Sequence, residues 1–231
     1  MKRRALARAF PALPALLLLG PVLCRPARAA PTSAEATLGI RAALERGATT
    51  AVELLGRPDG FLGNPQVRIP LPPALEQVAG VLKLMGQQRR VDELVTAMNR
   101  AAEAAVPEAK ALLVDAVRSM SVQDALNIVR GGETAVTEFF AGRTRQPLAQ
   151  RFLPIVSRAT EKVALAQSYN ELVGRASTLG LVRAEDANLE RHVTAKAVDG
   201  LFFMIGEEER RIRRDPVGTG SAILQKVFGR F

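Results

Sequence analysis

The sequence predicts an all-α protein: a single compact multi-helix domain packed around one long C-terminal helix, over about residues 188–214. Apolar residues recur three or four positions apart through most of the chain, which is the spacing of amphipathic helices. Glycine or proline interrupts these stretches at short intervals, as expected at helix ends. Within the C-terminal stretch, Ala197–Gly206 is apolar on almost every side except at Asp199. Because this run is too short to span a bilayer, we expect other helices to bury it.

Residues 1–29 have the pattern of a signal peptide for export. A basic start precedes the apolar run Ala12–Leu23, and the sequence Ala27-Arg28-Ala29 is a small-x-small cleavage pattern. We therefore expect cleavage near Ala29 and a periplasmic or secreted protein. Residues 30–231 would form the single helical domain, with no transmembrane helix in the mature chain.

The composition of the mature chain argues against several classes of protein. Residues 1–29 hold six of the 32 basic residues and no acidic one, which leaves 26 basic and 23 acidic groups, a net charge of +3. This balance, the absence of tryptophan and the single tyrosine argue against nucleic-acid binding. Cys24 is the only cysteine and lies in the predicted signal, so the mature chain has no thiol nucleophile or thiolate ligand. Since Leu23 rather than a small residue precedes Cys24, we do not expect a lipoprotein anchor there.

The first predicted helix covers Ser33–Leu55, and Gly56 can close its end. Residues 57–73 follow as an extended, proline-rich strap that cannot join a sheet interior. Long ordered loops are often functional. We favour the alternative, in which this strap covers helix ends and presses its aliphatic side chains on the core.

The middle of the chain contains four further helical stretches, separated by glycine or proline. They are Ala74–Met85 with Pro73 at its first position, Val91–Val106, Glu108–Met120, and a short helix between the cap Ser121 and the stop Gly131-Gly132. Only Pro107 separates the second and third of these, so we expect them to form a helical hairpin.

The C-terminal half is predicted to contain five helices, of which the long one is the fourth. They are Glu133–Ala141 with Gly142 as a stop, Arg145–Val163 capped by Thr144, Ala164–Leu179, Asn188–Arg214 and Ala222–Phe228. Pro154 predicts a kink or break near Arg151–Phe152. At the exposed end of the long helix, Glu207→Arg211 and Glu209→Arg213 have the four-residue spacing of helix ion pairs.

Four segments together resemble a known protein family. They are RIPLPP at Arg68–Pro73, MNRAAEAAVPEAK at Met98–Lys110, RFLPIV at Arg151–Val156 and DGLFFMIGEEE at Asp199–Glu209. They are similar to domain-of-unknown-function family 4197, over about Ala36 to Gly229. The resemblance implies an exported, all-helical bacterial domain. It implies no activity, cofactor or catalytic residue.

Two polar residues of the long helix are candidates for chemistry. Asp199 sits among apolar neighbours, where an unpaired charge is costly, so we expect it to be buried against Arg151 or Arg100. Such a pair is more often structural than catalytic. His192 is the only histidine. Without a second histidine or a cysteine it cannot form a zinc site, and we interpret it as a surface or capping residue.

Asn99 and Glu103 lie one turn apart beside the apolar face of their helix and could project into one groove. With Asp199 they are the candidate catalytic residues, since carboxylates can perform acid–base chemistry. The charges in these helices are common types at common spacings, so a structural role is favoured. We expect no metal site and no cofactor.

These observations favour a non-enzymatic periplasmic binding or interaction protein. One version holds an apolar, lipid-like ligand between helices under the strap, and its candidate binding residues are Phe61, Arg68, Arg100 and Arg151. The first alternative is a hydrolase or lyase that uses the carboxylate, asparagine and arginine cluster. The second is a scaffold for envelope proteins.

Overall fold

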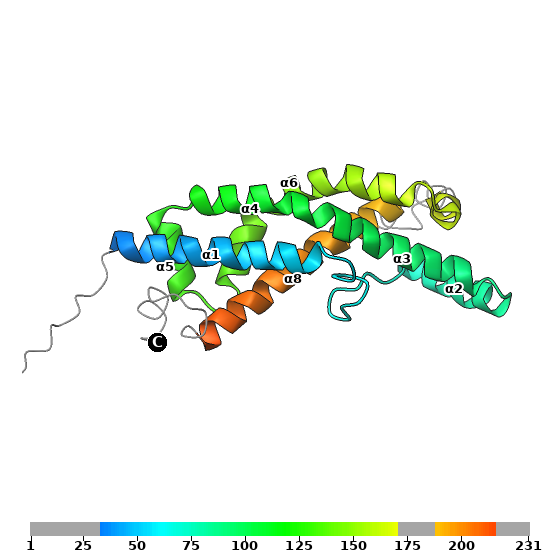
Figure 1. Cartoon of the computed structure of the whole chain (residues 1–231), viewed down its shortest axis with the longest axis horizontal. Coiled ribbons are helices and arrows are strands. Elements are labelled where there is room, and N and C mark those ends of the chain that lie inside the picture. The colour runs from blue at the N-terminus through cyan, green and yellow to red at the C-terminus, as the bar shows by residue number, and fades with distance from the viewer. Residues whose placement is uncertain (1–32, 171–187, 216–231) are drawn as a thin grey trace, which may run out of the picture. The chain divides into compact units, whose positions relative to one another are not determined.

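The computed structural model describes residues 33–170 and 188–215, and every regular element in these ranges is a helix (Figure 1). The all-α fold class is therefore confirmed. The elements are α1 Ser33–Leu55, α2 Pro73–Leu84, α3 Gln88–Ala105, the 3₁₀ turn η1 Val106–Glu108, α4 Ala109–Arg118, α5 Val122–Arg130, α6 Ala135–Thr160 and α8 Leu189–Arg214. Residues 164–170 are also helical. The predicted signal segment 1–29, most of the helix predicted at 164–179 and the one predicted at 222–228 lie outside the described residues.

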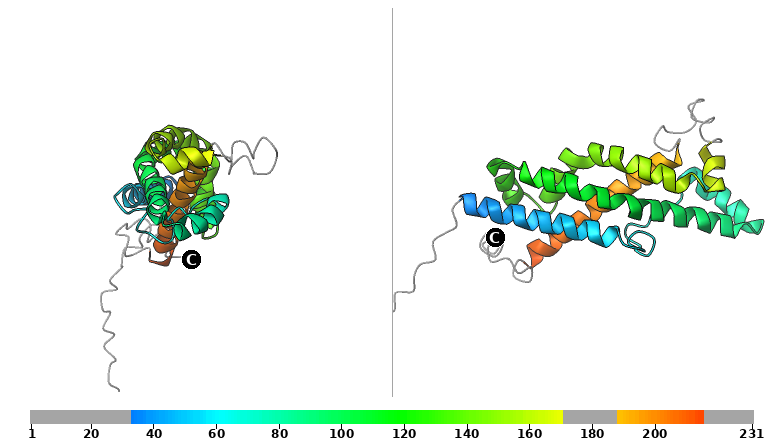
Figure 2. Two further views of the ribbon diagram at one scale, coloured as in Figure 1. Left: turned by 90° about the vertical axis from the view of Figure 1, so that its right-hand side faces the viewer. Right: turned by 45° about the horizontal axis from the view of Figure 1, so that its top comes forward.

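Helix α8 packs against α6, α1 and α3, and runs obliquely across them (Figures 1 and 2). Leu201, Phe202 and Ile205 are 0%, 3% and 2% exposed. The expectation that other helices bury this stretch is confirmed. Asn188 caps its start, because the Asn188 side chain accepts a hydrogen bond from the backbone N–H of Arg191 at 2.9 Å.

The predicted hairpin at Pro107 is wrong. Ala105, Val106, Glu108 and Ala109 all keep right-handed helical dihedrals, so the chain continues in the same direction through η1. Helices α3 and α4 consequently run almost in line in Figure 1. A proline in the first turn of a helix needs no hydrogen-bond acceptor, and Pro107 can therefore occupy this position without reversing the chain.

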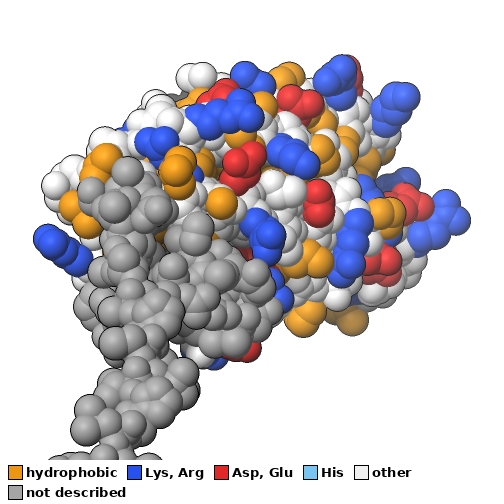
Figure 3. Space-filling view, turned by 60° about the vertical axis from the view of Figure 1, so that its left-hand side comes forward, with side chains coloured by type: hydrophobic (Ala, Val, Ile, Leu, Met, Phe, Trp, Pro, Cys, Tyr) orange, Lys and Arg blue, Asp and Glu red, His pale blue; other side chains and the backbone are white. Residues whose placement is uncertain are grey.

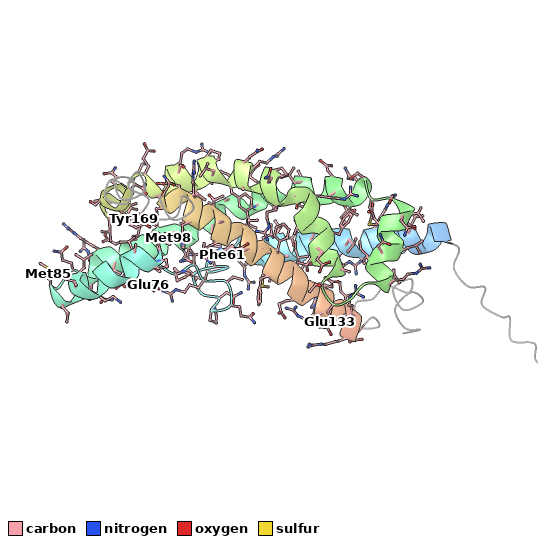
Figure 4. All side chains as sticks on the ribbon, turned by 180° about the vertical axis from the view of Figure 1, so that it is seen from behind. Phe61, Glu76, Met85, Met98, Glu133 and Tyr169 are labelled. Carbon is pink, nitrogen blue, oxygen red and sulfur yellow. The ribbon has the colours of Figure 1, made fainter. Side chains whose placement is uncertain are left out.

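The actual helical hairpin is formed by α2 and α3. Gly86 adopts a left-handed φ of +75° between them, a conformation that glycine adopts without steric cost. The packing of α2 is chiefly against α3, and the turned end of this hairpin lies away from α8 (Figures 1 and 4).

Helix α6 is one helix where two were predicted. Gly142 does not end it, and Thr144 is not a cap: its hydroxyl donates to the Phe140 carbonyl at 2.7 Å inside the helix. Pro147 and Pro154 also lie within the continuous helix, so of the kink or break predicted near Arg151–Phe152 the break is ruled out. Glycine weakens a helix by only about 1 kcal/mol, and tertiary packing overrides that preference here.

Candidate functional site

The candidate site is the strap together with the residues of α3 and α8 that hold it. In the structure the strap covers residues 56–72, because Pro73 already belongs to α2. The prediction of an extended segment is wrong for most of it, since residues 56–67 form bends and turns closed by hydrogen bonds such as that from the Arg68 N–H to the Asn64 carbonyl. The strap begins in a tight turn that has little space for side chains. A Cβ on Gly60 would lie 2.4 Å from the carbonyl oxygen of Leu55, which explains the glycine. Asp59 precedes it with a φ of +66°, a conformation that is uncommon for a residue other than glycine.

Glu103 of α3 binds the start of the strap. Its Oε1 accepts hydrogen bonds from the backbone N–H groups of Phe61 and Leu62, at 3.0 and 3.1 Å. Its side chain is only 5% exposed, and its Oε2 accepts from Arg100 at 2.7 Å. The carboxylate thus satisfies two backbone donors that would otherwise lack partners.

Arg100 connects Glu103 to the turn. Its guanidinium also donates to Asp59 at 2.8 Å, so one arginine bridges two carboxylates. The hydrogen bond that Arg100 donates to Glu103, followed by the charge of Glu103 and then by Asp59, raises the pKa of Arg100 above its usual value. This arginine was expected to pair with Asp199, and the structure assigns it to Asp59 and Glu103 instead.

Asn99 binds the second half of the strap. Its Oδ1 accepts from the backbone N–H of Ile69 at 2.8 Å, while its Nδ2 donates to the carbonyl of Ile69 at 3.1 Å. The same Nδ2 donates to the Val95 carbonyl at 2.8 Å, and Asn99 is 0% exposed. An amide side chain supplies both a donor and an acceptor, which a carboxylate cannot do when ionised.

The strap also packs on α8. Phe61 is 0% exposed, and a Cβ on Gly200 would lie 2.7 Å from its ring, so only glycine allows this approach. Phe61 accordingly lies beside α8 in Figure 4. His192 is 7% exposed, with Nε2 3.3 Å from the Pro70 carbonyl oxygen. Of the two predicted roles, surface or capping residue, the surface one is therefore wrong.

Asp199 is not buried as predicted. Its side chain is 52% exposed and pairs with Arg145 of α6 at 2.6 Å. The Arg145 guanidinium also lies 4.9 Å from the ring centroid of Phe202. Arg151, the other expected partner, lies 4.0 Å from Glu108. Asp199 therefore makes a surface ion pair, because its position on α8 faces outward at the edge of the apolar stripe.

An open groove of about 330 Å³ lies between strap residues 66–70 and α8. Arg68, Lys196, Asp199 and Phe203 contribute to its lining. Among the four predicted binding residues, Arg68 thus lies at an open surface, whereas Phe61 is in the core.

Glu209 has a structural role that the sequence analysis missed. It was expected at an exposed helix end, yet its side chain is 1% exposed. Its two oxygens accept from the backbone N–H groups of Val136 and Thr137, at 3.0 and 3.1 Å, and so cap the start of α6. The predicted pair with Arg213 is confirmed at 2.9 Å, whereas Arg211 pairs with Glu208. The sequence signal that could have predicted this role is the position of the Glu209 carboxylate inside the apolar stripe of α8.

These contacts describe a structural site, because Asn99 and Glu103 direct their polar atoms at the backbone of the strap. Within residues 33–170 and 188–215, no group of three His, Cys, Asp or Glu side chains is arranged to hold a metal ion. A partly open pocket between α1, α5, α6 and α8 measures about 30 Å³ and is lined by Leu44, Ile128 and Phe140 among others. That volume is about the share of one water molecule, whereas ligand pockets measure roughly 300–1,000 Å³. The open groove at the strap, at about 330 Å³, reaches only the lower end of that range.

A family model described as a protein of unknown function (DUF4197) matches residues 30–229. The chain belongs to the DUF4197 family. The anchors of the strap in this DUF4197 chain, Asn99, Arg100, Glu103 and Gly200, all lie inside the matched region. No curated protein and no solved structure matches the chain. Over the described part of this DUF4197 protein, none of the helices has both the length and the apolarity needed to cross a bilayer.

Proposed function

We propose that the protein is an exported, non-enzymatic interaction protein, and that the end of the α2–α3 hairpin is its recognition element. The observation that carries this proposal is the exposure of apolar side chains there. Leu84 is 89% exposed, Met85 67% and Val81 56%. An isolated exposed apolar residue is ordinary, but three of them at one projecting end favour contact with a partner.

The surroundings of the three predicted catalytic residues support a non-enzymatic role. Asn99 and Glu103 are buried and hydrogen-bonded to the strap, so neither offers a free group to a substrate. Asp199 lies in a different ion pair, with Arg145. The three residues therefore do not form the convergent cluster that a hydrolase or lyase would need.

The packing also argues against an apolar ligand under the strap. Phe61 and Ile69 are 0% and 1% exposed, and the Phe61 ring lies directly on Gly200. The strap itself thus fills the space around Phe61, and the groove between residues 66–70 and α8 lies open at the surface. Elsewhere on the surface, basic and acidic side chains are interspersed with small apolar patches, as one face shows in Figure 3.

The export part of the proposal rests on the signal pattern of residues 1–29 and is tested by fractionation. We expect the protein in the envelope or secreted fraction, with Ala30 as its first residue by N-terminal sequencing. A cytoplasmic protein that retains Met1 would overturn export.

The recognition element is tested by photocrosslinking in cells, with a photoreactive amino acid at position 84. The matched control places it at Val122, which is 48% exposed at the start of α5. We expect crosslinked products, to protein or to lipid, from position 84 and not from position 122. Equal or absent crosslinking at the two positions would contradict the proposal.

A further inference from the structure

We propose that the end of the α2–α3 hairpin binds the surface of an anionic lipid bilayer. This inference deepens the proposed function and rests on it, because it names the class of partner that the recognition element contacts. For this purpose the tip is defined as residues 81–91, which include the end of α2, the turn at Gly86 and the start of α3.

The geometry of the tip presents apolar side chains outward. The left-handed φ of Gly86 reverses the chain immediately after Leu84 and Met85, so these side chains lie at the end of the hairpin. Met85 occupies this end in Figure 4. Val91, the last residue of the tip, and Leu94, the next apolar residue of α3, are 2% and 0% exposed, so the base of the tip is buried.

The positive charge of the tip favours an anionic partner. Lys83, Arg89 and Arg90 are all exposed, and residues 81–91 contain no acidic residue. The acids nearest in sequence, Asp92 and Glu93, follow on α3, where Asp92 accepts from Gln88. Arg89 does pair with Glu93, but these side chains are 91% and 57% exposed, so the pair is weak and open to competition. Exposed apolar side chains ringed by cations are the features by which peripheral proteins bind anionic membranes.

The size of the tip favours a lipid surface over a folded protein. A stable protein interface usually buries about 800 Å² on each partner and involves roughly 20–30 residues a side. The tip offers three exposed apolar residues and three cations. A fluid headgroup layer can surround so small and convex a surface, whereas a folded partner would need a matching pocket.

Vesicle flotation tests the inference, using the purified protein in the form that cells accumulate. One set of vesicles contains phosphatidylglycerol and phosphatidylcholine, and the other contains phosphatidylcholine alone. We expect binding to the anionic vesicles at least tenfold tighter than to the neutral ones. Each basic residue near an anionic surface contributes about fivefold. We also expect this binding to weaken as salt is raised.

Substitutions within the tip test whether the tip is the part of the protein that binds the vesicles. Leu84→Ser with Met85→Ser removes the apolar contribution, and Lys83→Gln with Arg89→Gln and Arg90→Gln removes the charge. We expect each set to weaken binding at least tenfold. Leu38→Ser is the matched control, because Leu38 is 62% exposed on α1, and it should bind as the wild type does. All substituted positions are exposed, and circular dichroism verifies that each variant is folded.

Several outcomes would overturn the inference. They are no flotation, equal binding to both kinds of vesicle, and binding that the tip variants leave unchanged. Crosslinks from position 84 to a protein, without vesicle binding, would disprove the lipid surface yet keep the proposed function. A dimer that Leu84→Ser dissociates would instead identify a second copy of the chain as the partner. Absent crosslinks would disprove the proposed function itself.

Discussion

The side-chain amide of Asn99 pairs with the backbone of Ile69, accepting from its N–H at 2.8 Å and donating to its carbonyl at 3.1 Å. The side chain of a residue in α3 thus makes the pair of hydrogen bonds that the backbone of a neighbouring β-strand would otherwise make with Ile69. Four residues further along the same helix, Glu103 accepts from the N–H groups of Phe61 and Leu62. Two polar side chains one turn apart therefore hold the two halves of one loop, which is their role in the fold.

Asn99→Asp is expected to destabilise the protein by about 3 kcal/mol or more. The change replaces the amide donor with an oxygen that faces the carbonyls of Ile69 and Val95, in a site that is fully buried. Urea denaturation followed by circular dichroism measures the effect. Asn127→Asp is the matched control, because Asn127 is exposed on α5 and acts as an acceptor for Gln123. Equal losses at the two positions would contradict the anchoring role.

Glu103→Ala is expected to cost about 2–4 kcal/mol, because two backbone N–H groups of the strap lose their acceptor. Glu93→Ala on the same helix removes only a surface pair with Arg89 and should change stability by less than about 1 kcal/mol. Hydrogen exchange provides a second measurement. The amides of Phe61 and Leu62 should lose protection in Glu103→Ala, and unchanged protection would show that the carboxylate does not hold the strap.

Alanine substitutions at two helical glycines should change the stability of the protein in opposite directions. Gly200→Ala places a Cβ 2.7 Å from the Phe61 ring and should cost about 1–3 kcal/mol through overpacking. Gly142→Ala meets nothing within 4 Å in α6 and should stabilise the protein by about 0.5–1 kcal/mol through helix propensity. Thermal and urea unfolding of both variants measure the difference. Stabilisation by both would mean that Phe61 does not lie against α8.

Ser121 and Asp124 form a capping box at the start of α5, and this pair predicts a specific dependence of stability on pH. Hydrogen bonds from the backbone and side chain of Ser121, and then the charge of Arg143, lower the pKa of Asp124 below its usual value. A carboxyl whose pKa is lower in the folded state stabilises the protein above its unfolded pKa, near 3.8. That stabilisation is lost as pH falls through the lower, folded pKa.

Asp124→Asn tests this dependence by urea denaturation across the pH range from neutral to strongly acidic. The free energies of unfolding of wild type and variant should differ at neutral pH and converge in acid. The gap at neutral pH should be about 1 kcal/mol or less, since the Asp124 side chain is 26% exposed. A gap that stays constant in acid would mean that ionisation of Asp124 makes no contribution.

Sequence patterns predict several of these features. The bounds of α1 and of the long helix α8, the cap at Ser121 and the proline at the start of α2 were all predicted, because helix periodicity and capping are local properties. Asn99 and Glu103 were predicted to project into one groove, since residues one turn apart share a helix face. That these two residues bind the strap could not be predicted, because their partners lie 30 and 42 positions away.

The sequence by itself determined the helical class, the buried stripe of α8 and the presence of a proline-rich strap without helix, since each follows from the order of residue types within one segment. Only the tertiary structure decided that Gly142 and Pro154 lie inside one helix, that Asp199 faces solvent and that Glu209 caps α6. Such outcomes depend on which distant groups face each other once the helices have packed. A backbone donor is satisfied by whichever acceptor the fold brings within about 3 Å. The positions of donor and acceptor in the sequence do not show that they will come this close.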